Sequence, residues 1–115
     1  MDPRTVFEKM QDFQVIDVRW PHEWEAGRFE GARHIPMDEI ATRLEELERD
    51  RPVVAVCRTG DRSGRVAGFL KAQGFDAHNM EGGMKAWESQ GIPFAASDGG
   101  PGRVAHPDPA VDQQS

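Results

Sequence analysis

The chain is organised around residues 52–65, which read PVVAVCRTGDRSGR. Residues 53–56 form a short, unbroken and mostly β-branched apolar run, which favours a strand buried on both faces of a parallel sheet. From Ser63 onward the pattern predicts a helix, with Gly74 just past its end. The loop between strand and helix is polar, contains Gly60, and begins with Cys57, the only cysteine of the protein.

A strand, a short glycine-containing loop and a helix N-terminus together predict an anion site. The first-turn N–H groups of a helix lack intrahelical partners, and the helix dipole adds partial positive charge. Arg58, Arg62 and Arg65 stand here against one carboxylate, Asp61. A thiol at the mouth of such a loop is expected to have a lowered pKa, which makes it a candidate nucleophile. The alternative is a small buried cysteine that merely ends a strand. The arginines and the loop glycine favour the functional interpretation.

Composition narrows the class of protein. The length of 115 residues fits one domain, and 37% hydrophobic with 30% charged residues is typical of a globular protein. The net charge of −6, from 14 basic and 20 acidic side chains, argues against a nucleic-acid binder. One cysteine excludes an internal disulfide, and the four histidines show no metal-ligand spacing, so no metal is expected. Without a signal-peptide core or membrane-length apolar run, we expect a cytoplasmic protein with no membrane partner.

Three further segments have the character of strands. Residues 13–19 are apolar and end in charge, residues 31–36 predict a very short strand closed by proline, and residues 75–80 predict a weaker one. Asp17 and Arg19 lie where the first of these leaves the sheet, which is where open α/β sheets bind ligands. The pair supports the site directly or forms a structural salt bridge between loops, and the second interpretation is favoured.

Helical patterns fill the intervals. Asp2 predicts the cap of a short helix, and residues 20–27 predict one or two helical turns in which Glu23 is an exposed charge or a partner for an arginine. Residues 38–49 have a 3.6-residue apolar stripe and predict an amphipathic helix capped by Asp38. Gly82 and Gly83 precede a further helix, either as a second anion-binding turn or to let the backbone turn tightly beside the Cys57 loop.

The chain divides into a domain of residues 1–94 and a tail of residues 95–115. The tail is rich in Gly, Pro, Asp and Gln, and it has no aromatic residue and no period. We therefore predict that it is flexible. Strands that alternate with helices predict an α/β fold around a mostly parallel sheet for the domain.

Several motifs, in this order and spacing, resemble those of the single-domain rhodanese family. The resemblance spans residues 7–93 and is carried by Asp17-Val18-Arg19, Glu23, Trp24, Gly27, Gly31-Ala32-Arg33-His34-Ile35-Pro36, the Cys57 loop, Gly74-Phe75, Gly82-Gly83 with Trp87, and Gly91-Ile92-Pro93. It implies a three-layer α/β fold with a mostly parallel sheet of about five strands flanked by helices.

The resemblance also implies sulfurtransferase chemistry without a metal or organic cofactor. The loop cysteine, Cys57, would take a sulfane sulfur from thiosulfate or a similar donor, hold it as a persulfide, and pass it to cyanide, a thiol or a protein. The site residues carried over are Arg58, Thr59, Gly60, Asp61, Arg62 and Ser63, whose backbone would cradle the persulfide, with Asp17 and Arg19 in support. The side chains of Arg58 and Arg62 are candidates for holding an anionic donor, because thiosulfate is a dianion and sulfite leaves with negative charge. Thr59 stands where some thiosulfate-using relatives have a lysine.

Two other functions compete with this one. Phosphatases and arsenate reductases that share the fold place five residues between their cysteine and arginine, whereas four lie between Cys57 and Arg62. The shorter loop suits one sulfur atom better than a tetrahedral oxyanion. The second competitor is a protein-interaction or sulfur-relay module, in which the tail helps docking.

Overall fold

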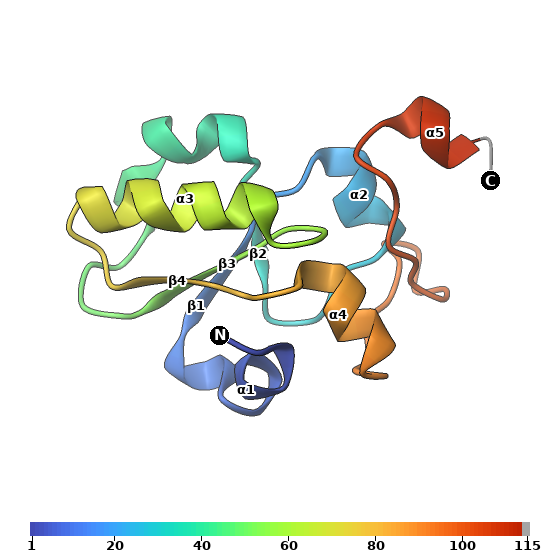
Figure 1. The fold of residues 1–115 in the computed structure, drawn as a ribbon, viewed down its shortest axis with the longest axis horizontal. Coiled ribbons are helices and arrows are strands. Elements are labelled where there is room, and N and C mark those ends of the chain that lie inside the picture. Colours follow the sequence, from blue (N-terminus) through green and yellow to red (C-terminus); the bar gives the residue numbers. More distant parts are fainter. Residues whose placement is uncertain (114–115) are drawn as a thin grey trace.

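The centre of the molecule is a four-stranded parallel sheet in the order β2-β1-β3-β4 (Figure 1). The computed structural model describes residues 1–113. Its strands are β1 (Gln14–Asp17), β2 (Arg33–His34), β3 (Val53–Val56) and β4 (Ala77–Asn79). The predicted α/β class is confirmed, and within the described residues the sheet has four strands where about five were expected.

Alternation along the central strand builds two apolar layers. Val53 and Ala55 face one layer with Cys57, whereas Val54 and Val56 face the other. Because side chains of a strand alternate between faces, an unbroken apolar run is what burial on both sides requires. The first layer packs against α3 (Asp61–Ala72), and the second packs against α1 (Pro3–Glu8) and α4 (Gly83–Ser89).

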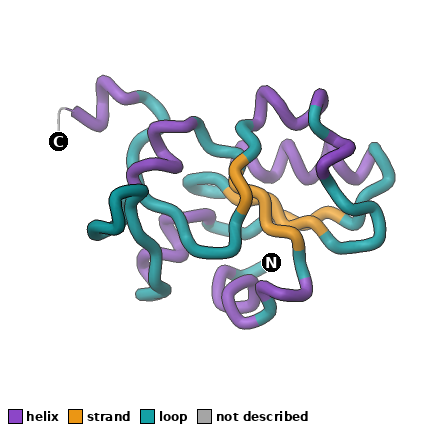
Figure 2. The backbone as a smooth tube through the Cα atoms, turned by 180° about the vertical axis from the view of Figure 1, so that it is seen from behind, coloured by secondary structure: helices purple, strands orange, loops and turns teal. Residues whose placement is uncertain are grey.

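The helices cover both faces of the sheet, as the tube view from behind also shows (Figure 2). Besides those named above, the structure contains η1 (Met10–Asp12), α2 (Pro21–Ala26), η2 (Met37–Thr42), η3 (Leu44–Glu46) and α5 (Pro109–Gln113). The helix expected from Ser63 begins at Asp61, and Gly74 follows its end with a φ of +93°. Among residues 1–113, no helix combines the length and the apolar character that crossing a bilayer needs.

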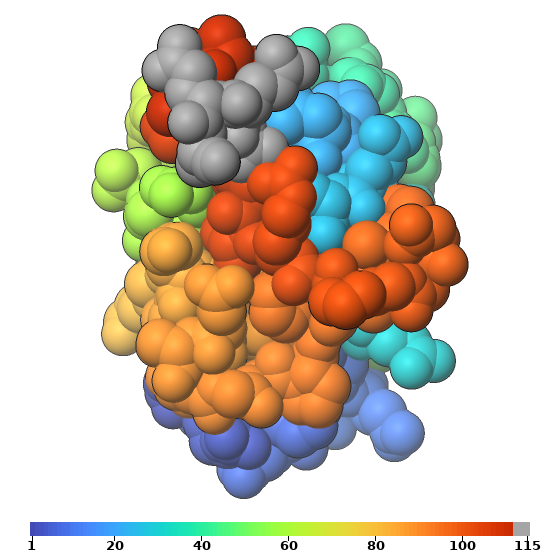
Figure 3. Space-filling view, turned by 90° about the vertical axis from the view of Figure 1, so that its right-hand side faces the viewer, coloured from blue at the N-terminus to red at the C-terminus, as the bar shows by residue number. Residues whose placement is uncertain are grey.

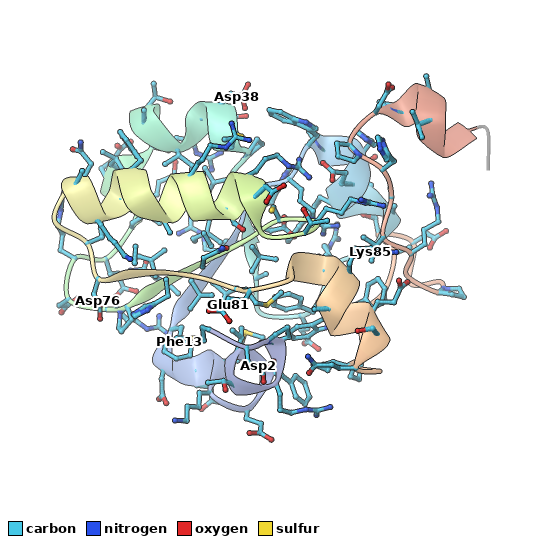
Figure 4. The ribbon with its side chains drawn as sticks, in the orientation of Figure 1. Asp2, Phe13, Asp38, Asp76, Glu81 and Lys85 are labelled. Atoms are coloured by element: carbon cyan, nitrogen blue, oxygen red, sulfur yellow. The ribbon has the colours of Figure 1, made fainter. Side chains whose placement is uncertain are left out.

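The prediction of one amphipathic α-helix over residues 38–49 is wrong. The segment forms the two 3₁₀ helices η2 and η3, separated by Arg43, whose φ of −124° lies outside the helical range. The expected apolar positions are still used, because Ile40 and Leu47 are buried against α3 and the sheet. Asp38 does not cap the segment, because Pro36 occupies the N-cap position of η2. Asp38 lies in the first turn, and its exposed side chain points away from the sheet (Figure 4).

The first part of the predicted tail lies against α2 and the second apolar layer. The backbone of Ala95 exchanges two hydrogen bonds of 2.9 Å with that of Arg28, and the Arg103 N–H donates to the Ala26 carbonyl at 3.0 Å. Ala105 is fully buried. In Figure 3 this segment, coloured orange to red, covers the surface beside α2 in blue. The mobility of residues 95–115 stays a prediction, and residues 114 and 115 lie outside the described residues.

Candidate active site

Cys57 lies directly after β3, at the carboxyl edge of the sheet, and its side chain is only 1% exposed. Two donors face its Sγ atom: the backbone N–H of Gly60 at 3.1 Å and the hydroxyl of Ser63 at 3.2 Å. We expected several inward-facing amides. Over residues 1–113 the hydrogen bonds to this sulfur come from one amide, that of Gly60, and one hydroxyl, that of Ser63.

The loop is closed by a left-handed glycine and by an asparagine from the next strand. Gly60 has a φ of +103°, a conformation that L residues with side chains rarely adopt, and it caps the N-terminus of α3. Asn79, at the end of β4, donates from Nδ2 to the Gly60 carbonyl at 3.0 Å, and its Oδ1 lies 2.6 Å from the Ser63 Oγ. Sequence analysis missed Asn79, although a polar residue at the carboxyl end of a parallel strand is the signal that could have found it.

The N-terminus of α4 docks onto the backbone of the loop. The Met84 N–H donates to the Cys57 carbonyl, and the Lys85 N–H donates to the Arg58 carbonyl, both at 2.9 Å. A Cβ atom on Gly83 would lie 2.6 Å from the carbonyl carbon and oxygen of Arg58. This close approach supports the interpretation of the glycine pair as a tight turn beside the loop; Figure 4 labels Glu81 and Lys85 on either side of that turn.

Asp17 and Arg19 form the structural salt bridge that was favoured for them. Both side chains are buried, and the guanidinium contacts both carboxylate oxygens at 2.7–3.1 Å. Arg19 Nη2 also donates to the Gly27 carbonyl at 2.7 Å, which ties the end of β1 to the end of α2. The His34 ring, stacked on Trp24, hydrogen-bonds through Nε2 to the Arg19 carbonyl at 2.7 Å.

A second buried ion pair joins α2 to the first turn of α3. Arg62 donates from Nη1 and Nη2 to the two oxygens of Glu23 at 2.8 and 2.7 Å, and Glu23 also accepts the Trp20 N–H at 2.9 Å. Of the two roles considered for Glu23, the partner of an arginine is therefore confirmed. Sequence analysis could not choose Arg62 as that partner, because the two residues are 39 positions apart.

The electrostatics of this pair favour its charged form. Burial alone would raise the pKa of Glu23, but the hydrogen bonds from Arg62 and Trp20, with the positive charges of Arg62 and Arg19, hold it below the usual value. The hydrogen bond to Glu23 raises the pKa of Arg62 against the effect of burial, and negative charge on Glu23, Cys57 and Asp17 adds to the rise.

The remaining predicted residues line the loop in different ways. Arg58 is half-buried, and its Nε atom is buried with no hydrogen-bond partner among the described residues. Thr59 and Asp61 are exposed. The structure thus brings Cys57, the loop backbone and Ser63 together around the sulfur. The binding roles expected of Arg58, Thr59, Asp61 and Arg62 stay predictions.

Comparison with known proteins relates this geometry to a family. The family model described as a rhodanese-like domain matches residues 3–90. A sulfurtransferase of Allochromatium vinosum is 37% identical over 90 residues, which are 77% of this chain and 84% of that protein. The thiosulfate sulfurtransferase GlpE of Pseudoalteromonas translucida is 36% identical over 80 residues, or 69% and 76% of the two chains.

Solved structures agree with the sequence matches. A rhodanese-related protein of Thermoplasma volcanium superimposes with a TM-score of 0.78 at 29% identity, covering 83% of this chain and 95% of its own. A rhodanese-like domain protein of Staphylococcus aureus gives a TM-score of 0.72 at 36% identity, covering 76% and 88%. With a buried cysteine between β3 and α3 and matches over most of its length, the chain belongs to the rhodanese-like domain family.

Proposed function

We propose that this protein is a sulfurtransferase that carries a sulfane sulfur as a persulfide on Cys57. Membership of the rhodanese-like family and relatives named sulfurtransferases support a transferase of this type. The observation that carries the proposal is the pair of donors at the sulfur, the Gly60 N–H and the Ser63 hydroxyl, which favour negative charge on Sγ.

The chemistry is a double displacement. The Cys57 thiolate attacks the outer sulfur of thiosulfate or a similar donor, the S–S bond of the donor breaks, and sulfite leaves with the electron pair. An acceptor nucleophile, such as cyanide, a thiol or a protein thiol, then attacks the outer sulfur of the Cys57 persulfide and regenerates the thiolate. Splitting one transfer into two steps is the usual advantage of a covalent intermediate.

The narrowness of the site supports sulfur transfer over phosphate chemistry. Cys57 is 1% exposed, and a terminal sulfur atom is the smallest end that a donor can present to it. The loop also has four residues between Cys57 and Arg62, one fewer than the phosphatases and arsenate reductases of this fold, which leaves its backbone less room around three phosphoryl oxygens.

Mass spectrometry of the intact protein tests the proposal. After incubation with thiosulfate we expect a gain of one sulfur atom, which cyanide removes with formation of thiocyanate, and which Cys57→Ser does not acquire. In parallel, the protein is incubated with an aryl phosphate. Release of phosphate without sulfur loading would replace the proposal with the phosphatase alternative.

A further inference from the structure

The Arg62 guanidinium, expected to hold an anionic donor, is already bound to a carboxylate inside the protein. Glu23 is fully buried and the Arg62 side chain is only 13% exposed, so this bidentate pair is largely shielded from water. Bidentate arginine–carboxylate pairs are among the strongest charge-assisted hydrogen bonds, and removing one partner of a buried pair leaves an uncompensated charge. A donor cannot recruit Arg62 without competing against Glu23.

The neighbouring cation is neutralised in the same way. Arg19 is paired with Asp17 and is fully buried. The two ion pairs beside the loop therefore sum to no net charge. Of the other side chains of the loop, Arg58 is half-buried, Asp61 is an exposed carboxylate, and Thr59 carries no charge. A dianion such as thiosulfate therefore meets fewer available cations at this site than the three arginines of residues 57–65 suggest, because Arg62 is already neutralised inside the protein.

We propose that Glu23 determines donor specificity: by holding Arg62 it favours sulfane sulfur donors with at most one negative charge, of the organic persulfide class, over dianionic thiosulfate. This inference rests on the sulfur transfer proposed above. The Cys57 thiolate attacks the outer sulfur of R–S–SH, the donor S–S bond breaks, and R–S⁻ leaves with the electron pair, so that Cys57–S–SH forms. The atoms and charges balance without an oxidant or reductant.

The rate at which each donor loads Cys57 in a single turnover tests this specificity. The probes are thiosulfate and the hydropersulfide of 2-mercaptoethanol, and loading is followed by quenching and intact mass. Glu23→Gln keeps the size of the side chain and a polar group at its end. It removes the negative charge that neutralises Arg62. We expect the second-order loading rate with thiosulfate to rise about tenfold, while that with the hydropersulfide changes less than about threefold.

Two controls connect the effect to Arg62. Glu25→Gln removes an exposed carboxylate from the same helix and should leave both rates unchanged. In the double variant Glu23→Gln/Arg62→Gln, the gain with thiosulfate should disappear.

Thr59→Lys offers a test that does not disturb the buried pair. A cation added at this exposed position should raise the rate of thiosulfate loading but not the rate of hydropersulfide loading.

The outcomes separate the two proposals. If neither donor loads Cys57 of the unmodified protein, sulfur transfer fails, and donor selection by Glu23 fails with it. If Cys57 is loaded but Glu23→Gln and Thr59→Lys leave the ratio of the two rates unchanged, only the role of Glu23 is overturned. Should Glu23→Gln not fold, the double variant Glu23→Gln/Arg62→Gln decides: an unchanged ratio of the two rates supports the proposal, whereas a selective loss of thiosulfate loading shows that Arg62 binds this donor despite Glu23.

Discussion

The Ser63 hydroxyl lies 3.2 Å from the Cys57 Sγ atom and, on its other side, 2.6 Å from Asn79 Oδ1. A hydroxyl has one hydrogen to donate, so these two acceptors compete for it. The Asn79 amide is oriented by its own bond from Nδ2 to the Gly60 carbonyl, which leaves Oδ1 as the atom that faces Ser63. Hydrogen bonds to charged acceptors are stronger than those to neutral ones, so ionisation of Cys57 shifts this competition toward the sulfur.

Ser63→Ala should therefore slow sulfur loading with every donor. It removes one of the two donors to the sulfur, and a hydrogen bond to a charged group contributes about 1.5–3 kcal/mol, which corresponds to a fall of roughly ten- to hundredfold in the loading rate. Ser89→Ala is the matched control, because the Ser89 hydroxyl donates to a backbone carbonyl on the exposed side of α4. Equal loading rates in the two variants would show that the Gly60 N–H alone stabilises the sulfur.

Gly83→Ala should displace the loop that begins at Cys57. The new Cβ would overlap the backbone of Cys57 and Arg58, where α4 docks through its N–H groups. Gly91→Ala separates this clash from the cost of the backbone conformation, since Gly91 also has a positive φ but no atom within 4 Å of the added Cβ. We expect Gly83→Ala to lose about 1–3 kcal/mol more free energy of unfolding than Gly91→Ala, and to lose sulfur loading. Urea denaturation and intact mass measure the two effects.

The sheet and the loop were predictable because their signals are local. The apolar run of residues 53–56 is short, β-branched and followed at once by a glycine-containing polar loop, and each of these features depends on neighbouring residues alone. The 3₁₀ geometry of residues 37–46 was not predictable in this way. Its apolar positions fit an α-helix, but Arg43 leaves the helical range and pairs with both Glu39 and Glu46 across the break.

The parts of the site that sequence analysis did not find depend on contacts between segments that are distant in the sequence. Glu23 and Arg62 are 39 residues apart, and Asn79 reaches the loop from another strand, so neither pattern nor spacing could assign the partners. The tail illustrates the same limit. Its composition is that of a flexible segment, yet Ala105 is buried, and Arg103 and His106 on either side of it hydrogen-bond to α2, some eighty residues earlier in the sequence.

Lowering the pH should reduce the free energy of unfolding, partly because the Glu23 carboxylate becomes protonated. The pKa of this carboxyl is lowered by folding, so its contribution to stability is fully present above about pH 4.5 and is lost as the pH falls through the lower value in the folded state. The pKa of Arg62 is raised by the hydrogen bond to Glu23, so this guanidinium stays charged throughout the acid range and its own titration adds nothing there. We expect the difference in free energy of unfolding between the unmodified protein and Glu23→Gln to shrink from pH 7 to pH 3 in urea titrations. A difference that is constant over this range would contradict the lowered pKa of Glu23 in the folded protein. Glu25→Gln is the control for the loss of one acidic charge on α2.

Removal of residues 95–115 should destabilise the domain, contrary to what their composition suggests. The truncation removes two backbone hydrogen bonds to Arg28, the bond from Arg103 to Ala26, and the buried side chain of Ala105. At about 0.5–1.5 kcal/mol for each of these three hydrogen bonds, we expect a loss of about 1.5–4.5 kcal/mol and a fall of several degrees in melting temperature.

A shorter truncation isolates the contacts that matter. Removal of residues 109–115 takes away α5 but keeps the hydrogen bonds of Ala95 and Arg103 and the contact between the His22 ring and the His106 carbonyl. Its melting temperature should stay close to that of the full chain. If both truncated proteins melt at the same temperature as the full chain, residues 95–106 do not hold their position on α2 in solution, and the flexible tail expected from composition is the better description.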